Sequence, residues 1–257
     1  MDTSTSIEYD LRGKVAIVTG GGKGIGRAIA LGLARAEASL VVASRTGAEI
    51  EAVAEEIRGA GGTALAVVTD LTATDQIDNL VDVTIGEFGR VDVLVNNAAR
   101  SYMRSLLDLK EEGWDNVFDT NCKGVFLLSR AVAKKMIDQG GGKIINITTV
   151  GAERAGVGLS AYYASKAALK MLTMCMAAEW APYNINVNAV GPGLTRTEFS
   201  RPIWDHPERA KRYLSAVPKG RVAEPDEITG AVLFLASDAS DFITGQSIYV
   251  DGGYLAI

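Results

Sequence analysis

The sequence predicts one α/β domain, in which a doubly wound, largely parallel seven-stranded sheet carries helices on both faces. Seven short apolar runs indicate the strands, and several of them are continuous in valine and isoleucine. Such runs are typical of strands buried on both faces, whereas alternating runs indicate one solvated face. Segments with helical spacing separate most of the runs, which is typical of right-handed crossovers between parallel strands.

The strands and helices follow one another in the order that such a sheet requires. The first strand lies in KVAIVTG and the first helix covers residues 24–36; LVVAS is the second strand and residues 47–59 are the second helix. A third strand in ALAVVTD precedes a helix that has apolar residues at helical spacing and Thr74 as its N-cap. The other strands lie in VDVLVNN, GKIINIT, INVNAVGPG and QSIYVDGG.

The predicted domain covers residues 11–257, after a short polar tail of residues 1–10. Residues 193–224 form the one long stretch without a clear period, and they follow the carboxyl end of a strand. Ligands of open α/β sheets bind at that edge. We therefore expect residues 193–224 to form a substrate lid.

Composition limits the class of protein. The chain has 257 residues, of which 47% are hydrophobic, and a net charge of -5 with no basic run, so a large core is expected and a nucleic-acid partner is not. No apolar run is long enough to cross a membrane, and the N-terminus lacks the features of a signal peptide, so we expect a cytoplasmic protein without a membrane partner. Two cysteines and one histidine make a disulfide framework or a metal site unexpected, and His206 is expected in a solvated loop.

A glycine-rich turn joins the first strand to the first helix. The stretch VTGGGKGIG fits the pattern T-G-x-x-x-G-x-G, with Thr19, Gly20, Gly24 and Gly26 at its fixed positions. Glycines allow a tight turn and close approach of the backbone to a pyrophosphate, and the helix N-terminus offers free N–H groups. The sequence therefore predicts a Rossmann-type dinucleotide site, whose turn residues are Gly20, Gly22, Lys23, Gly24, Ile25 and Gly26.

The end of the second strand favours NADP over NAD. A coenzyme with a free ribose 2′-hydroxyl usually meets an acidic residue there, but the strand ends with Ser44 and Arg45. The guanidinium of Arg45 can grip a 2′-phosphate, Ser44 can donate a hydrogen bond, and Lys23 can add a second positive charge. The alternative is that Arg45 is a solvated loop residue.

The stretch YYASK contains a candidate proton-transfer pair. Tyr162 and Lys166 are four residues apart, so they lie on one face of a helix, whereas Tyr163 finds Ala167 at that spacing. A nearby cation lowers the pKa of a phenol by favouring its charged form. If the chain has such a site, its tyrosine is Tyr162, and Tyr163 packs or lines a pocket.

Several motifs in order make a resemblance specific. They are TGGGKGIG, TD at 69–70, NNAA at 96–99, TN at 120–121, YYASK at 162–166 and GPG at 191–193. Together they resemble the short-chain dehydrogenase/reductase family from about residue 11 onward. The resemblance implies that Tyr162 protonates a carbonyl while hydride arrives from the nicotinamide, and that Lys166 lowers the pKa of the tyrosine and holds the ribose. It also implies that Asn121 helps to hold a water in the proton relay.

The same resemblance assigns further residues to the coenzyme. Asp70 matches the residue that contacts adenine, and Thr197 matches the threonine that grips the nicotinamide carboxamide. The residues implied to line the coenzyme are Asp70, Leu71, Asn97, Ala98, Ala99, Pro192, Gly193, Thr195 and Thr197.

One position departs from the family pattern. The family usually has a serine thirteen residues before the tyrosine, and this chain has Thr149 there. Threonine keeps the hydroxyl, but its methyl group restricts χ1 and takes space beside the substrate. Either Thr149 replaces the serine in a narrower pocket, or the site is impaired or altered; Thr148 is expected on the other side of the strand.

The sequence says less about the substrate. Arg100, Arg154 and Arg196 would suit a carboxylate or phosphate if two of them converge, although each can also be a solvated loop arginine. Leu159 and Trp204 are candidates for an apolar wall. The stretches NINVNAVGPG and SDFITGQSIYVDGG resemble gluconate 5-dehydrogenase-like members and 3-oxoacyl-carrier-protein reductases, so a polyhydroxy acid and a 3-oxoacyl thioester are the two small-molecule substrate classes considered.

We therefore predict an NADP-dependent enzyme that interconverts a secondary alcohol and a ketone. The alternatives are a non-catalytic NADP-binding protein and a dehydratase or isomerase on the same scaffold. Family members are commonly tetramers, and small residues on the tyrosine's helix, Ala167, Ala168 and Ala177, would allow close packing between subunits. A homotetramer is the expected assembly, with a dimer as the alternative.

Overall fold

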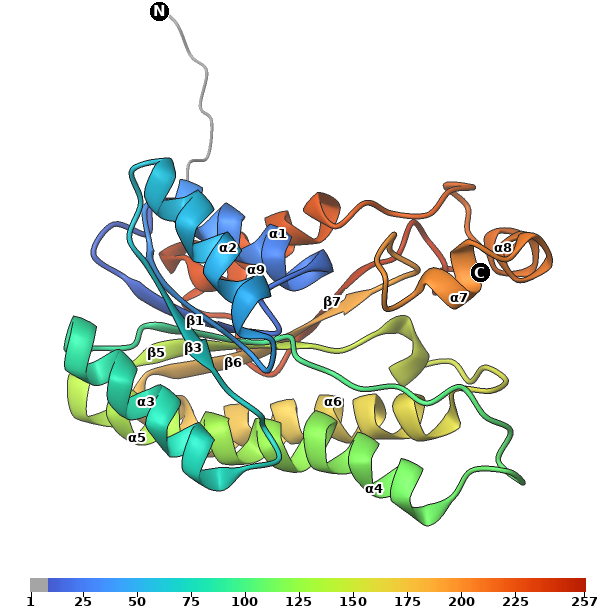
Figure 1. The fold of residues 1–257 in the computed structure, drawn as a ribbon, viewed down its shortest axis with the longest axis horizontal. Helices are drawn as coiled ribbons and strands as arrows, with labels where there is room; N and C mark the ends of the chain where they lie inside the picture. The colour runs from blue at the N-terminus through green and yellow to red at the C-terminus, as the bar shows by residue number, and fades with distance from the viewer. Residues whose placement is uncertain (1–8) are drawn as a thin grey trace, which may run out of the picture.

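Within residues 9–257, the sheet has seven strands, and every pairing between them is parallel. A computed structural model describes residues 9–257, with the strand order β3-β2-β1-β4-β5-β6-β7 (Figure 1). The predicted fold class is confirmed, and the sheet is parallel throughout. The strands are β1 Val15–Thr19, β2 Ser39–Ser44, β3 Ala64–Val68, β4 Val93–Asn96, β5 Gly142–Ile147, β6 Ile185–Pro192 and β7 Ser247–Val250.

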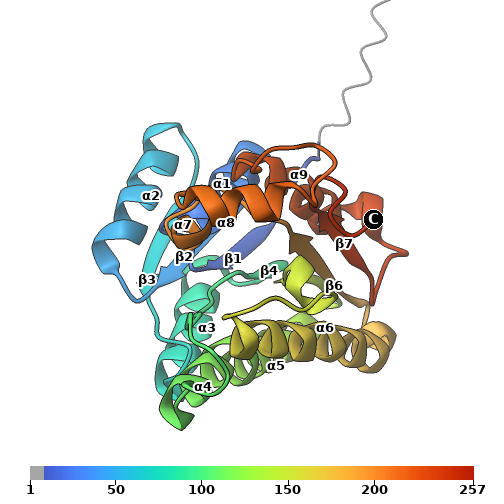
Figure 2. The same cartoon turned by 90° about the vertical axis from the view of Figure 1, so that its right-hand side faces the viewer.

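Helices cover both faces of the sheet, as Figures 1 and 2 show. One face carries α1 (Gly24–Arg35), α2 (Gly47–Gly59) and α9 (Asp226–Ala236). The other face carries α3 (Thr74–Phe88), α4 (Glu111–Phe118), α5 (Val125–Gln139) and α6 (Ser160–Trp180). The shorter elements are the π-helix η1 Asp119–Gly124, the 3₁₀ turns η2 Val150–Ala152, η3 Ala181–Tyr183 and η4 Asp238–Ser240, and the helices α7 Arg201–Trp204 and α8 Pro207–Leu214.

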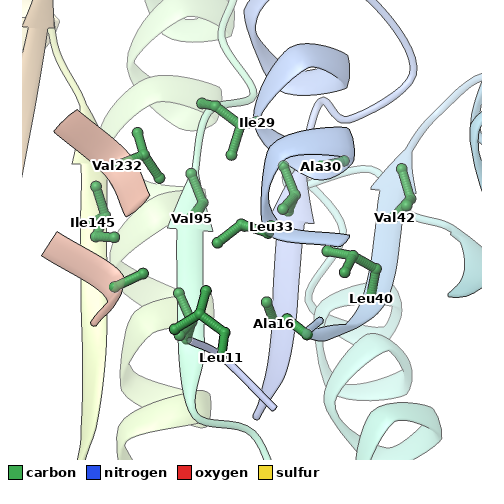
Figure 3. Close-up of a cluster of buried hydrophobic side chains, with 14 of the residues drawn as sticks. Leu11, Ala16, Ile29, Ala30, Leu33, Leu40, Val42, Val95, Ile145 and Val232 are labelled. Atoms are coloured by element: carbon green, nitrogen blue, oxygen red, sulfur yellow. The ribbon is translucent and has the colours of Figure 1, made fainter. Parts of the chain in front are cut away.

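Two hydrophobic cores lie on the two faces of the sheet. Successive residues of a strand point to opposite faces, so Ala16 and Val18 belong to the core beneath α1 and α9, while Ile17 belongs to the core against α3 and α5. Figure 3 shows the first core, in which Leu33 of α1 and Val232 of α9 both lie over the central strands. Burial on both faces explains why the strands are continuous apolar runs.

The order of the strands places the site. From β1 the chain proceeds to β2 and β3 on one side, and it returns to β4 on the other side. The loops after β1 and β4 therefore diverge, which leaves a crevice at the carboxyl edge of the sheet.

Several details differ from the sequence-based expectations. Ala73, not Thr74, is the N-cap of α3, because the chain turns at Asp70 and the N–H of Ala73 bonds the Asp70 carbonyl at 3.0 Å. The stretch 193–224 is not irregular throughout: Pro202 and Pro207 lie in the first turns of α7 and α8, where a fixed φ and a missing N–H fit a helix.

Two further expectations concern the tail and the tyrosine's helix. Most of the predicted tail, residues 1–8, lies outside the described residues, and the ring of Tyr9 lies 6.4 Å from that of Phe234. Ala177 is buried in the core against β6, so it is not available for packing between subunits.

Within residues 9–257, no helix combines the length and apolar character needed to cross a bilayer, and no cluster of metal-ligating side chains occurs.

Candidate active site

A cleft of about 1140 Å³ lies at the carboxyl ends of the central strands. The glycine turn, the loops after β2 to β6 and the start of α6 line it. Thr149, Tyr162, Lys166, Arg100, Leu159 and Trp204 line the cleft, whereas Asn121 and Arg154 do not. All predicted coenzyme residues line it as well: Gly20, Gly22, Lys23, Gly24, Ile25, Gly26, Ser44, Arg45, Asp70, Leu71, Asn97, Ala98, Ala99, Pro192, Gly193, Thr195 and Thr197.

The glycine turn is shaped for close backbone approach. Gly20 and Gly24 have φ values of +63° and +53°, which favour glycine, and a Cβ on Gly26 would lie 2.1 Å from the carbonyl oxygen of Gly20. The amide of Asn97 donates to the carbonyls of Thr19 and Gly20, at 3.0 and 3.1 Å, and so braces the turn. No side chain caps the N-terminus of α1, so its N–H groups fit a pyrophosphate.

The end of β2 offers cationic groups. Ser44 accepts a hydrogen bond from the N–H of Thr46 at 3.2 Å. Arg45 is exposed, and within residues 9–257 its guanidinium has no hydrogen-bond or ion-pair partner. Lys23 lies across the cleft edge, where its ammonium is 2.9 Å from the carboxylate of Glu49. These groups fit a phosphate on the ribose.

Asp70 presents a charged carboxylate after β3. Burial raises its pKa, but hydrogen bonds from the N–H and hydroxyl of Thr72, with the charges of Arg100 and Arg45, bring the pKa below its ordinary value overall. The Arg100 guanidinium lies 3.7 Å from this carboxylate. Asp70 is therefore an acceptor at this end of the cleft.

Tyr162 and Lys166 lie on one face of α6, as the sequence predicts. The Lys166 ammonium lies 6.0 Å from the centre of the Tyr162 ring and donates to the carbonyl of Ile147 at 2.6 Å. Lys166 is only 1% exposed, and burial lowers its pKa to about 8. Tyr163 lines the cleft and packs against Gly151, in agreement with its predicted packing role.

The pKa of Tyr162 differs from the expectation. Burial raises it well above its ordinary value and the neighbouring Tyr163 adds to the rise, while a hydrogen bond with Thr149 acts in the opposite direction. The Lys166 ammonium donates to the Ile147 carbonyl, so its predicted effect on the phenol stays a prediction. Tyr162 is therefore a protonated phenol at neutral pH, which makes it a proton donor.

Thr149 lies beside Tyr162, as the predicted replacement for serine requires. Its hydroxyl accepts from the N–H of Gly151 at 3.3 Å and pairs with the Tyr162 phenol. Thr148 also borders the cleft, but its buried hydroxyl donates to the carbonyl of Val190 at 3.1 Å. The structure thus brings Thr149, Tyr162 and Lys166 together, whereas the Thr148 hydroxyl is bonded to the backbone of β6.

Asn121 is fully buried behind the cleft in the π-helix η1. Its side-chain oxygen accepts from the N–H of Arg100 at 2.8 Å, and its amide donates to the Arg100 carbonyl and to the Ser165 hydroxyl, each at 2.9 Å. The side chain therefore ties the loop after β4 to α6. π-Helical turns are frequent at functional sites. The predicted role of Asn121 in a water relay stays a prediction.

The arginines predicted for the substrate do not converge. Arg100 faces Asp70, and Arg196 bonds Glu224 at 2.9 Å and lies over the Trp204 ring. Arg154 lies outside the cleft, where it bonds the carbonyl of Ile257. The convergence of two arginines that a carboxylate site would need is not observed, because each guanidinium contacts a different part of the chain. Leu159 and Trp204 do line the cleft.

Comparison with known proteins agrees with this geometry. A family model described as Enoyl-(Acyl carrier protein) reductase matches residues 20–255. The chain is 41% identical to 2-dehydro-3-deoxy-D-gluconate 5-dehydrogenase of Escherichia coli, over 96% of this chain and 98% of the relative. The chain belongs to the short-chain dehydrogenase/reductase family. The predicted resemblance is therefore confirmed.

Solved structures of short-chain dehydrogenases/reductases match the whole fold. One from Mycobacterium marinum superposes with a TM-score of 0.93 at 41% identity, covering 97% of this chain and 98% of the other. A gluconate 5-dehydrogenase from Burkholderia cenocepacia, in complex with NADP and tartrate, superposes with a TM-score of 0.94 at 38% identity and the same coverage.

Some residues of this short-chain dehydrogenase/reductase site carry no local sequence signal. Phe199 lies 5.6 Å from the Tyr162 ring and forms part of the cleft wall. Tyr213 of α8 accepts from the N–H of Leu194 at 3.0 Å and stacks on Tyr254. Ser165, one residue before Lys166, could have been found from its place on α6, because it shares a turn with Tyr162. The partners of Phe199 and Tyr213 depend on the fold.

Proposed function

We propose that this protein is an NADP-dependent oxidoreductase that interconverts a secondary alcohol and a ketone. The observation that carries the proposal is the meeting of Tyr162, Thr149 and Lys166 at the cleft that the glycine turn also borders. When bound, the coenzyme supplies or accepts the hydride. The oxidoreductase class agrees with the names of the relatives.

The residues of the site divide the remaining work. Tyr162 donates its phenol proton to the carbonyl oxygen in reduction, and the phenolate accepts a proton from the alcohol in oxidation. Thr149 orients the substrate oxygen through its hydroxyl. The buried charge of Lys166 favours the phenolate that forms in the reaction and holds the nicotinamide ribose. Asn121 fixes the loop and the helix that carry these groups and helps to hold a relay water.

NADP is the proposed coenzyme because the site offers cations where a 2′-phosphate would lie. Arg45 is free to bind it, and Ser44 and Lys23 border the same part of the cleft. The related gluconate 5-dehydrogenase was crystallised with NADP. The pyrophosphate would lie at the uncapped N-terminus of α1, with Thr195 and Thr197 at the nicotinamide end.

We further propose a polyhydroxy acid as substrate, with a 3-oxoacyl thioester as the alternative. Relatives named for gluconate derivatives support the first class, and the description of the family model supports the second. Since the arginines do not converge, hydrogen bonds to the hydroxyl groups and the carbonyl of the substrate, not an arginine pair, would orient it. Residues 193–224 would act as the lid of a single cytoplasmic domain, residues 11–257, that assembles into homotetramers.

The test is loss of NADPH absorbance with sugar acids, 3-oxoacyl thioesters and cyclic diketones. The native protein should turn over at least one ketone, and Tyr162→Phe should lower kcat by about a thousandfold or more, because the proton donor is lost. The variant should bind NADPH as tightly as the native protein. Equal turnover by Tyr162→Phe would contradict the assignment, and product without coenzyme change would indicate a dehydratase or isomerase.

A further inference from the structure

The part of the cleft that fits the 2′-phosphate contains an acidic residue as well as the cations. Glu49 lies in the first turn of α2, five residues after the end of β2, and it lines the cleft. Its Cβ lies against the glycine turn, because a Cβ built on Gly22 would be 2.8 Å from it. An acid three residues after the N-cap commonly bonds back to the cap, and Thr46 and Glu49 have this spacing.

Glu49 instead reaches across the cleft edge. Its carboxylate accepts from the ammonium of Lys23 at 2.9 Å, and the Thr46 side chain makes no capping bond. The Glu49 side chain is 34% exposed and that of Lys23 is 65% exposed. An ion pair this exposed contributes little to folding stability. Its main effect is to reduce the net positive charge that the site offers to a ligand.

Arg45 provides the contrast within the same site. Its guanidinium has no ion-pair partner within residues 9–257, whereas the Lys23 ammonium is held by Glu49. A phosphate monoester carries about -1.5 to -2 charges at neutral pH. Arg45, Lys23 and Glu49 together carry a net charge of about +1, which does not balance the charge of the phosphate. A neutral 2′-hydroxyl makes no such demand.

We propose that Glu49 sets the coenzyme selectivity of this enzyme by holding Lys23 and so restraining its attraction for a 2′-phosphate. Arg45 is then the main phosphate ligand. Lys23 attracts the phosphate less strongly, because Glu49 neutralises part of its charge. The inference rests on the proposed use of NADP. Binding of NADPH and NADH without substrate tests it separately from turnover.

The experiment measures dissociation constants of NADPH and NADH by nucleotide fluorescence at low salt. Glu49→Gln keeps the shape of the side chain and removes its charge. NADPH should bind about threefold to tenfold more tightly to this variant, from the Coulomb energy of one nearby charge, and NADH should change less than about twofold. The gain should shrink at high salt because the site is solvated.

Two further variants make the result specific. Glu51→Gln makes the same charge change on the same helix outside the cleft, where Glu51 pairs with Arg58 at 2.5 Å, and should leave both constants unchanged. In the Lys23→Met background, the substitution Glu49→Gln should bring little further gain in NADPH affinity, because the restrained cation is absent.

Unchanged or weaker NADPH binding by Glu49→Gln would overturn the proposal, and so would a full gain in NADPH affinity that persists in the Lys23→Met background. Weaker NADH binding with NADPH unaltered would instead make Glu49 an acceptor for a ribose hydroxyl. If neither nucleotide binds the native protein, the proposed function fails first.

Discussion

Lys166 shows that the chemistry of the site conflicts with stability at the level of one residue. The side chain is buried, and burial lowers its pKa to about 8. At pH 7 its ammonium is still charged, so the fold contains a buried charge, which donates a hydrogen bond to the Ile147 carbonyl. This energetic cost is consistent with the proposed role of Lys166, in which its charge favours the Tyr162 phenolate during the reaction.

Lys166→Met should abolish reduction and yet stabilise the protein. A pKa lowered from 10.5 to about 8 corresponds to about 3 kcal/mol, of which the lost hydrogen bond offsets about 1 kcal/mol. The melting temperature at pH 7 should rise by several degrees. Between pH 8 and 10.5 the unfolded chain binds more protons than the native chain, so native stability rises with pH and the difference should shrink. A variant less stable at pH 7, by calorimetry, would contradict this account.

Thr149 is the second residue whose exchange is informative. Thr149→Ser keeps the hydroxyl and should retain activity within a fewfold of native. Thr149→Val keeps the shape but loses the hydroxyl, so kcat should fall about a hundredfold or more because the substrate oxygen loses a donor. NADPH affinity serves as the control and should not change. Equal kcat in the two variants would show that the hydroxyl does not act on the substrate.

At the scale of elements, the segment 193–224, which is the proposed lid, is held by contacts that join distant parts of the chain. Tyr213 of α8 accepts from the N–H of Leu194 directly after β6, and its ring stacks on Tyr254 at 4.8 Å between centres. The Arg154 guanidinium lies over the other partner of this stack, 5.1 Å from the Tyr254 ring. Residues 193–224, the C-terminal segment and the loop after η2 therefore support one another.

Tyr213→Phe should loosen the segment 193–224 without disturbing Tyr162 and Lys166. The Leu194 N–H loses its acceptor, which costs about 1–3 kcal/mol locally. KM for the ketone should rise severalfold, with a smaller change in kcat, and the 193–224 segment should be cut faster by protease. Tyr183→Phe, at a half-exposed site in η3, is the matched control. An unchanged KM together with unchanged proteolysis would exclude this role.

At the scale of the whole molecule, the helices on one face keep apolar side chains exposed. Trp114 of α4, Phe126 of α5, and Met171 and Met174 of α6 are between 37% and 59% exposed. Light scattering should give a mass four times that of the 27.1 kDa chain, or twice for the alternative dimer. Phe126→Glu should lower this mass, because a buried interface does not tolerate an unpaired charge. A monomeric native protein would contradict the proposed assembly.

The sequence by itself determined the features that repeat locally or follow the chain. Continuous valine and isoleucine runs separated by helical segments determined the parallel sheet, because burial on both faces leaves no polar alternation. The glycine turn followed from a pattern in which Gly26 must lie against Gly20, and the pair Tyr162 and Lys166 followed from a four-residue helical spacing. Each of these signals lies within a few residues of the group that it predicts.

Only the tertiary structure decided which side chains meet across elements. The sequence leaves open whether two of Arg100, Arg154 and Arg196 converge on a substrate, and the fold gives each a different partner. The fold places Asn121 behind the cleft. It also brings together Glu49 and Lys23, which are 26 residues apart in the sequence, and Tyr213 and Leu194, which are 19 residues apart. The physical reason is that such contacts depend on how strands and helices pack. The spacing of two residues along the chain does not determine how far apart they lie in the folded protein.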